Sequence, residues 1–350
     1  MKRSKLFPFY FIAAVLIAVS INCNFANNLM GKEDEPAQSV EGVLTPGSPL
    51  SKATEIAQEA APTQPPKEVE KTTPEPEAVP PIVIETCAEE ICILEGTYLL
   101  DRPIGPDGRN TIDYANRFGE YRRVTKSAHH GSDFLNSTGT PVLAVADGIV
   151  LVGGNDSEQI YGKILNEYGN MIVIEHSLPG MPNPLYTLYA HLDQVFVRSG
   201  DTVTAGEEIG LVGMTGSVTG STLHFEVRLG ENGYRSARNP ELWLELLEGE
   251  DGQLNGGLTG RIVDAEGEFV HMPNIVLDRL GGPGEPALDK LYLKTYTDTH
   301  IAGQTPWGEN FGAGGLIPGE YKISFWLDKM HQKIVEIEPG KLTFVTFVVE

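Results

Sequence analysis

Short runs of β-branched and apolar residues, interrupted by glycine, begin near Ile93 and dominate the rest of the chain. In the first part of this region the runs are residues 141–146, 148–152, 171–175 and 223–227. Turn-forming pairs such as Asp147-Gly148 separate them. The pattern predicts an all-β domain with antiparallel sheets, which we place at 86–248. One short helix is expected at 240–247, where Pro240 can occupy the first turn.

A second series of runs follows the polar joint at 248–252. Its expected strands are residues 257–263, 274–277, 321–325, 333–337 and 342–347. About seven short strands over some ninety residues predict a smaller β-sandwich, which we place at 256–350. The turn phrases Gly314–Tyr321 and Glu338–Gly340 resemble those of carboxypeptidase-regulatory-like modules. Trp307 and Trp326 are candidates for a binding face, but core packing is the favoured interpretation of both.

The region before the β-rich part has a different composition. Between about Gly31 and Pro81 the sequence is rich in Pro, Glu, Ala and Thr and contains no aromatic residue. Such a segment buries too little apolar surface to offset its ordering entropy. We therefore expect residues 24–85 to be a disordered, semi-extended linker.

The first 23 residues have the pattern of an export signal. Lys2, Arg3 and Lys5 precede an apolar run from Phe7 to Ile21. That run is about fifteen residues long, whereas a membrane-spanning helix needs roughly twenty. Cys23 follows directly, so a cleaved signal peptide, a lipoprotein signal with a lipidated Cys23 and a retained anchor stay open. Each predicts an extracellular or cell-envelope protein, with a membrane tether in the last two cases.

The other two cysteines, Cys87 and Cys92, lie close together before the β-rich region. In an oxidising compartment they would pair as a disulfide. A C-x₄-C metal site is the alternative, but two thiolates without a nearby histidine make a poor zinc site. The disulfide is therefore the preferred interpretation.

The formal net charge of −22 limits the possible partners. Binding to phosphate backbones depends on clustered Lys and Arg, and a strongly acidic chain repels nucleic acid and anionic lipid. We therefore expect no nucleic-acid partner.

Histidines and an aspartate occur in three ordered motifs. These are His129-His130-Gly131-Ser132-Asp133, Tyr189-Ala190-His191 and Leu223-His224-Phe225-Glu226. In this order the motifs resemble the lysostaphin and LytM-type endopeptidases, whose signature is H-x-G-x-D, then Y-x-H, then H-x-H-F-E. The resemblance covers roughly residues 95–245. It implies a duplicated-hybrid-motif β fold and a secreted zinc metalloendopeptidase that hydrolyses peptide cross-links of peptidoglycan.

The resemblance implies one zinc ion per chain, bound by His129, Asp133 and His224. Two imidazoles and one carboxylate leave a fourth tetrahedral position for water. The metal lowers the pKa of that water, so the zinc-bound water is the expected nucleophile. The other histidines lack such motifs: His130 is expected to be a surface neighbour, and His176, His271, His300 and His331 are expected to be structural or solvated.

Three further residues complete the implied site. His191 occupies the position that orients the attacking water or accepts its proton. Tyr189 faces the same side if both lie on one strand, so it is a candidate for substrate binding, with core packing equally open. Thr222 stands where the family has a second catalytic histidine. Its hydroxyl can assist by hydrogen bonding, but losing an acid/base group typically costs on the order of 10²- to 10⁴-fold in rate.

Two functions follow from these residues. The first is an active zinc endopeptidase that acts on peptidoglycan or another extracellular peptide. The alternative is a catalytically weakened or inactive module that binds the cell wall or regulates another hydrolase, because Thr222 replaces a histidine. A pure binding role needs no zinc ligands, so the complete ligand set favours the enzyme. A third possibility, an adhesive role for the C-terminal sandwich, has no clear support in its sequence.

Overall fold

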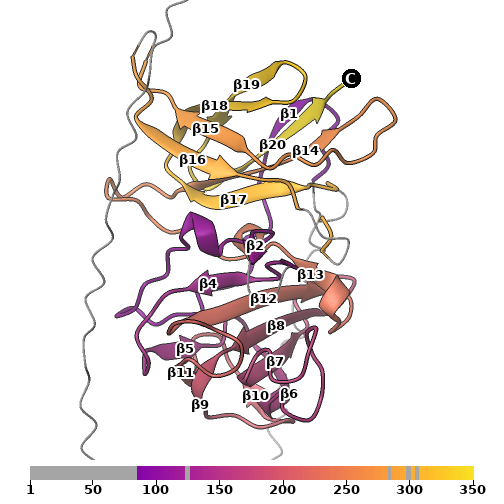
Figure 1. Cartoon of the computed structure of the whole chain (residues 1–350). Helices are drawn as coiled ribbons and strands as arrows, with labels where there is room; N and C mark the ends of the chain where they lie inside the picture. The colour runs from indigo at the N-terminus through magenta and orange to yellow at the C-terminus, as the bar shows by residue number, and fades with distance from the viewer. Residues whose placement is uncertain (1–84, 123–126, 283–284, 297–300, 304–306) are drawn as a thin grey trace, which may run out of the picture. The chain divides into compact units, whose positions relative to one another are not determined.

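The computed structural model of the chain describes residues 85–122, 127–282, 285–296, 301–303 and 307–350 (Figure 1). Its elements in these ranges are β-strands and short 3-10 helices. The prediction of an all-β, antiparallel fold is thereby confirmed. The expected export signal, the linker up to residue 84 and His300 lie outside the described residues. In the part of the chain that is described, no helix is long and apolar enough to cross a membrane.

A seven-stranded antiparallel sheet is the framework of the first β region. Its order is β10-β6-β7-β8-β12-β13, and β4 also pairs with β12. The strands are β4 (Ser132–Phe134), β6 (Gly148–Asn155), β7 (Asn170–His176), β8 (Leu185–Ala190), β10 (Thr202–Val203), β12 (Leu223–Leu229) and β13 (Ala237–Arg238). Because β12 pairs with β4, β8 and β13, it meets more neighbours than an edge strand does.

Smaller elements surround this sheet. A three-stranded sheet has the order β5-β11-β9, and β2 pairs with β3. The bounds are β2 (Tyr121–Arg122), β3 (Ser127–Ala128), β5 (Pro141–Leu143), β9 (Leu192–Val195) and β11 (Glu208–Val212). The 3-10 helices are η1 (Tyr114–Asn116), η2 (Tyr234–Ser236) and η3 (Pro240–Leu242).

The helix expected at 240–247 is limited to the single turn η3. The Asn239 side chain accepts a hydrogen bond from the Glu241 backbone N–H (3.1 Å) and so caps its start. Beyond that turn the chain does not continue as a helix, because Leu244 instead forms a parallel bridge with Leu100.

Side chains alternate between two environments along β12. Leu223, Phe225 and Val227 belong to the main apolar core and are fully buried. Their neighbours His224, Glu226 and Arg228 project from the opposite side of the strand, as the period of two requires. This second side of β12 carries the candidate site.

The C-terminal region is a sandwich of two four-stranded sheets, with orders β1-β20-β14-β17 and β16-β15-β18-β19. The strands are β1 (Ile91–Leu94), β14 (Gly256–Val263), β15 (Ile275–Arg279), β16 (Asp289–Leu293), β17 (Phe311–Leu316), β18 (Gly319–Trp326), β19 (Met330–Ile337) and β20 (Leu342–Val348). β14 and β20 pair in parallel, whereas the other paired strands of the described residues are antiparallel. Apolar residues from both sheets, including Leu258, Leu277 and Ile323, form its core.

The first strand, β1, does not belong to the peptidase-like domain that was expected to begin at residue 86. β1 pairs with β20, with Ile91 opposite Val345 and Leu94 opposite Leu342, and it lies beside that strand in Figure 1. β1 is therefore a strand of the sandwich sheet, although it precedes the peptidase-like motifs in sequence. A four-residue strand gives no local sign of a partner some 250 residues away.

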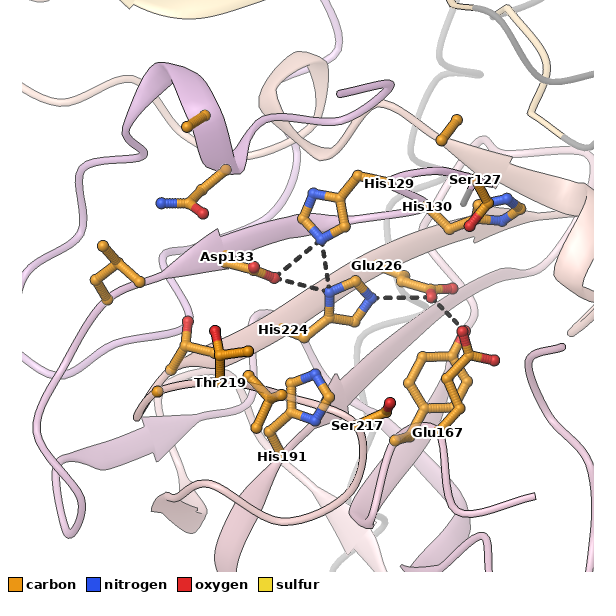
Figure 2. Close-up of a pocket in the computed structure, with 18 of the residues that line it drawn as sticks. Ser127, His129, His130, Asp133, Glu167, His191, Ser217, Thr219, His224 and Glu226 are labelled. Atoms are coloured by element: carbon orange, nitrogen blue, oxygen red, sulfur yellow. Dashed lines mark hydrogen bonds and ion pairs between the residues drawn. The ribbon is translucent and has the colours of Figure 1, made fainter. Parts of the chain in front are cut away.

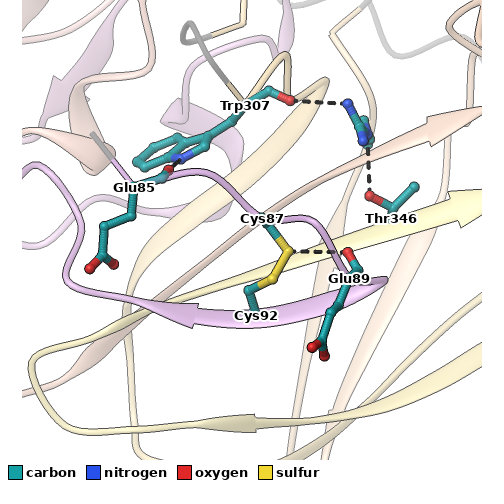
Figure 3. The surroundings of a disulfide bond; sticks show 7 residues. Glu85, Cys87, Glu89, Cys92, Trp307 and Thr346 are labelled. Carbon is teal, nitrogen blue, oxygen red and sulfur yellow. Dashed lines mark hydrogen bonds between the residues drawn. A yellow bond between two sulfur atoms is a disulfide. The ribbon is translucent and has the colours of Figure 1, made fainter. Parts of the chain in front are cut away.

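The segment before β1 is attached to the sandwich (Figure 3). Cys87 and Cys92 form a disulfide with their Cα atoms 5.7 Å apart. The indole N–H of Trp307, which is buried, donates to the carbonyl oxygen of Glu85 (2.6 Å). The expectation of core packing is wrong for Trp326, whose position at the end of β18 leaves it 65% exposed.

Candidate metal centre

Three residues from separate segments converge on one point: His129 in the loop after β3, Asp133 on β4 and His224 on β12 (Figure 2). Asp133 on β4 lies directly opposite His224 on β12. His129 Nε2 lies 3.0 Å from both Asp133 Oδ1 and His224 Nδ1, and those two atoms are 2.8 Å apart. A triangle of this size leaves a point about 2.1 Å from all three atoms, which is the zinc–ligand distance for imidazole and carboxylate.

Gly131 explains how the loop between His129 and Asp133 approaches β12. A Cβ atom at this position would lie 2.3 Å from the carbonyl oxygen of Phe225 and 2.9 Å from the His224 ring. Only glycine permits this close contact without a shift of the backbone. The glycine in the H-x-G-x-D motif therefore has a steric reason.

Each histidine of the centre is oriented by a second hydrogen bond. His129 Nδ1 donates to the carbonyl oxygen of Arg117 (3.0 Å), which directs Nε2 toward the other two residues. His224 Nε2 lies 3.1 Å from Glu226 Oε1, which directs Nδ1 to the same point. Such partners fix the tautomer and the ring orientation of metal-binding histidines.

The electrostatics of the centre favour positive charge. Although burial opposes the effect, hydrogen bonds to Asp133 and Glu226 raise the pKa of His224 to about 9. Burial would raise the pKa of Asp133, but His129 and His224 hold it well below its usual range. The donor set and its charge therefore fit a divalent cation of the zinc type.

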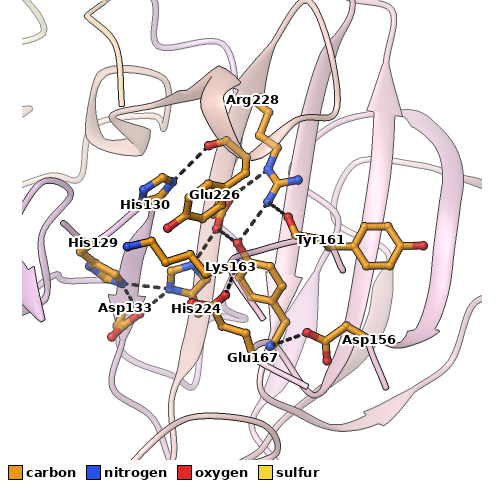
Figure 4. Close-up of polar contacts among 12 residues, drawn as sticks. His129, His130, Asp133, Asp156, Tyr161, Lys163, Glu167, His224, Glu226 and Arg228 are labelled. Atoms are coloured by element: carbon orange, nitrogen blue, oxygen red, sulfur yellow. Dashed lines mark hydrogen bonds and ion pairs between the residues drawn. The ribbon is translucent and has the colours of Figure 1, made fainter. Parts of the chain in front are cut away.

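A buried polar network lies behind His224 (Figure 4). Arg228 Nε donates to Glu226 Oε2 (2.7 Å), and the Tyr168 hydroxyl donates to Glu226 Oε1 (2.6 Å). A guanidinium N–H of Arg228 donates to the Tyr168 oxygen (3.1 Å). Burial would raise the pKa of Glu226, but Arg228 and His224 hold it below its usual range. The network thus keeps a carboxylate charged beside His224.

His191 lies at the edge of the centre. It follows the end of β8 and has a φ of 63°, a left-handed conformation that non-glycine residues rarely adopt. Its Nδ1 donates to the carbonyl oxygen of Thr215 (2.9 Å), which leaves Nε2 as the nitrogen with the lone pair. Burial lowers the pKa of His191 to about 4, so the ring is neutral at pH 7. A neutral imidazole in this position can accept a proton.

The structure corrects the expectation that Tyr189 faces substrate. Its ring is fully buried in the core against Phe225, and its hydroxyl accepts a hydrogen bond from the backbone N–H of Val145 (3.1 Å). The strand alternation that linked it to His191 fails because β8 ends at Ala190 and the left-handed residue turns the chain.

His130 is also different from the expected surface neighbour. It is buried and stacks on the ring of Tyr234, with centroids 3.7 Å apart. Its Nδ1 donates to the carbonyl oxygen of the same tyrosine (3.1 Å). The ring therefore forms part of the wall of the cavity rather than the outer surface.

Thr222 lies on the same side of the chain as His224, two residues earlier. Its hydroxyl donates to the carbonyl oxygen of Phe134 (3.1 Å), and the residue is almost fully buried. The proton of this hydroxyl is therefore directed to the backbone, and only its lone pairs remain for a ligand.

A cavity of about 440 Å³ opens above these residues. His129, Asp133, His224, His191, Thr222 and Glu226 all contribute to its lining, together with the loop 217–220. The structure thus brings together all predicted site residues of the peptidase-like region except Tyr189.

Sequence reasoning missed Glu226, Arg228, Tyr168 and Arg117 as supporting residues. Glu226 and Arg228 could have been found from the sequence, because they follow His224 at alternate positions of a strand and must share its face. Arg117 contacts His129 from 12 residues away and Tyr168 contacts Glu226 from 58 residues away, and the sequence has no local sign of either contact.

The chain is similar to known proteins over this region. Residues 127–238 match Peptidase family M23. The chain is 39% identical over 106 residues to the peptidoglycan DD-endopeptidase ShyA of Vibrio cholerae, a match that covers 30% of this chain and 21% of ShyA. It is 35% identical over 105 residues to the murein hydrolase activator NlpD of Escherichia coli, covering 30% and 24%. The chain thus matches less than a quarter of either relative.

Among solved structures, the catalytic domain of the antimicrobial peptidase lysostaphin from Staphylococcus simulans is 28% identical. The match covers 37% of this chain and 89% of that domain, with a TM-score of 0.32. The family match falls on the segment that carries His129, Asp133, His191 and His224. The chain therefore contains a domain of peptidase family M23, of the lysostaphin and LytM type.

Proposed function

We propose that the protein is a zinc endopeptidase that hydrolyses peptide cross-links of peptidoglycan. The observation that carries the proposal is the convergence of His129, Asp133 and His224 beside His191 in one cavity. The family match supports a peptidase, and ShyA is named as an endopeptidase of peptidoglycan.

His129, Asp133 and His224 would hold the zinc ion. When bound, zinc supplies a Lewis acid and a water of lowered pKa. Arg117 and Glu226 keep the two ligand rings in the orientation that the ion requires.

His191 is the proposed proton carrier. As the oxygen of the attacking water forms its bond to the scissile carbonyl carbon, Nε2 of His191 accepts the water's proton. The C–N bond then breaks, and His191 returns the proton to the leaving amine. Thr222 offers lone pairs to a donor group of the substrate, because its own proton is directed to Phe134.

The proposed setting is the cell envelope. We propose an export signal at 1–23, followed by a linker at 24–85 that leads to the folded region. The disulfide Cys87–Cys92 suits an oxidising compartment. The peptidase domain would extend to about residue 248 and the sandwich from 256 to 350, with β1 added to the sandwich sheet.

A second candidate function is a regulatory module with little or no hydrolysis. Thr222 supports it, because a hydroxyl cannot exchange a proton near neutral pH as the family's second histidine does. The similarity to NlpD, which is named a murein hydrolase activator, points in the same direction.

Digestion of purified peptidoglycan separates the two functions. The full chain, His129→Ala and Thr222→His are incubated with cell walls, and newly exposed amino groups are counted. The enzyme proposal predicts release by the wild type, loss in His129→Ala, and a gain in Thr222→His. Release by Thr222→His alone would instead support the regulatory module.

A further inference from the structure

We infer that the C-terminal sandwich positions the metal ligand His129 through residues 117–120. This inference rests on the proposed zinc site. Segment 117–120 is bonded to His129 at three points: Gly119 N–H donates to the His129 carbonyl (2.8 Å), His129 N–H donates to the Glu120 carbonyl (2.8 Å), and the ring bonds to the Arg117 carbonyl. A shift of this segment must therefore shift the ligand.

Tyr296 of the sandwich region holds the middle of the segment. Its ring meets Phe118 edge to face, with centroids 5.1 Å apart. Gly119 has a φ of 79°, and a Cβ there would lie 2.6 Å from Tyr296 Cδ1. The tyrosine hydroxyl accepts a hydrogen bond from the Asn239 side chain (3.0 Å), which fixes the ring in place.

Charged contacts hold both ends of the segment. Lys294 Nζ lies 2.5 Å from Glu120 Oε2. At the other end, the Arg117 guanidinium pairs with Glu241, whose Oε2 also accepts the backbone N–H of Gly314 on β17 (3.0 Å). Continuous contacts therefore run from the sandwich sheet to the carbonyl that orients His129.

The ion pair between Arg117 and Glu241 contributes little to the free energy of folding. Both side chains are largely buried and line a cavity of about 80 Å³. Among the described residues, Arg117 Nε and Glu241 Oε1 have no hydrogen-bond partner. Burial raises the pKa of Glu241. A buried ion pair of this kind adds little net stability, but it fixes the positions of its partners. That is the property a positioning role needs.

Tyr296→Ala in the full chain tests the inference. The zinc dissociation constant is measured by chelator competition at a temperature where every variant is folded. Loss of an outer partner of a metal ligand typically weakens metal affinity by roughly 10- to 100-fold. We expect about tenfold weaker zinc binding for Tyr296→Ala and near wild-type binding for Tyr296→Phe, which keeps the ring.

Two controls separate positioning from general destabilisation. Tyr292→Ala removes an exposed tyrosine of β16, and Leu277→Ala makes a cavity in the sandwich core. Both should keep wild-type zinc affinity, although Leu277→Ala should unfold at a lower temperature. Wild-type affinity in Tyr296→Ala, or an equal loss in Leu277→Ala, would overturn the inference.

Amide hydrogen exchange on the metal-free chain gives a second readout. The N–H groups of Gly119 and His129 should exchange faster in Tyr296→Ala than in Leu277→Ala, because their hydrogen bonds join the two segments. If the wild type itself binds no zinc, the proposed function fails. The exchange result then still decides whether the sandwich holds the segment, and equal exchange in both variants would reject that.

Discussion

The two sides of strand β12 differ in what they contact. Leu223, Phe225 and Val227 pack into the apolar core, whereas His224 is the proposed metal ligand and Glu226 and Arg228 form the charged network behind it. Both sets share one stretch of backbone and alternate residue by residue. One side therefore secures the fold and the other carries the proposed metal site, so that neighbouring substitutions should have separable effects.

His224→Ala should have the largest effect on function. It removes a ligand from the polar side, so zinc is lost and hydrolysis falls. Metal catalysis supplies several kcal/mol of transition-state stabilisation, equivalent to roughly 10³-fold in rate or more. Metal content and peptide release measure the change. Retention of one zinc per chain would show that the ligand set is wrong.

Phe225→Ala, one residue along, should act mainly on stability. The ring is fully buried, and its removal leaves a cavity that lowers the free energy of unfolding by about 3–5 kcal/mol. Urea denaturation of the metal-free chain measures the loss. The matched control is Phe269→Ala, whose ring is 59% exposed and whose removal should change stability by about 0.5 kcal/mol or less. Equal losses in both variants would contradict the assignment of the apolar side.

Glu226→Gln should weaken the metal site without removing a ligand. The amide can still accept from His224 Nε2, but it lacks the charge that balances Arg228. We expect zinc affinity to fall roughly 10- to 100-fold. Chelator competition measures it, with Glu208→Gln as the control, because Glu208 is exposed at the start of β11. Unchanged affinity in Glu226→Gln would limit the network to a structural role.

Thr222→Val should have the smallest effect. The substitution keeps the shape and removes the hydrogen bond to the Phe134 carbonyl, which should lower the free energy of unfolding by about 1 kcal/mol. The hydrolysis rate should fall less than about tenfold, since the hydroxyl does not carry the proton. A fall of about 100-fold or more would instead give Thr222 a direct part in the reaction.

Features with a local pattern could be predicted from the sequence. The strands around Val173 and Phe225 follow from β-branched runs between turns, and His129, Asp133 and His224 follow from ordered motifs. Asp133 and His224 meet because β4 pairs with β12 in the register that sets them opposite each other.

Features that depend on distant contacts could not be predicted in this way. The pairing of β1 with β20 and the contact of Phe118 with Tyr296 join segments far apart in the chain. Tyr189 was misjudged for a local reason, because the left-handed backbone at His191 interrupts the strand alternation. Such a conformation at a non-glycine residue leaves no mark in the sequence pattern.

The metal content of the purified full chain tests the central claim most directly. Wild type and Asp133→Asn are dialysed against buffered zinc at neutral pH, and bound metal is measured by elemental analysis. The three-residue centre predicts one tightly bound zinc per wild-type chain and a large loss of affinity in Asp133→Asn. Wild type without bound zinc, or equal binding by both chains, would contradict it.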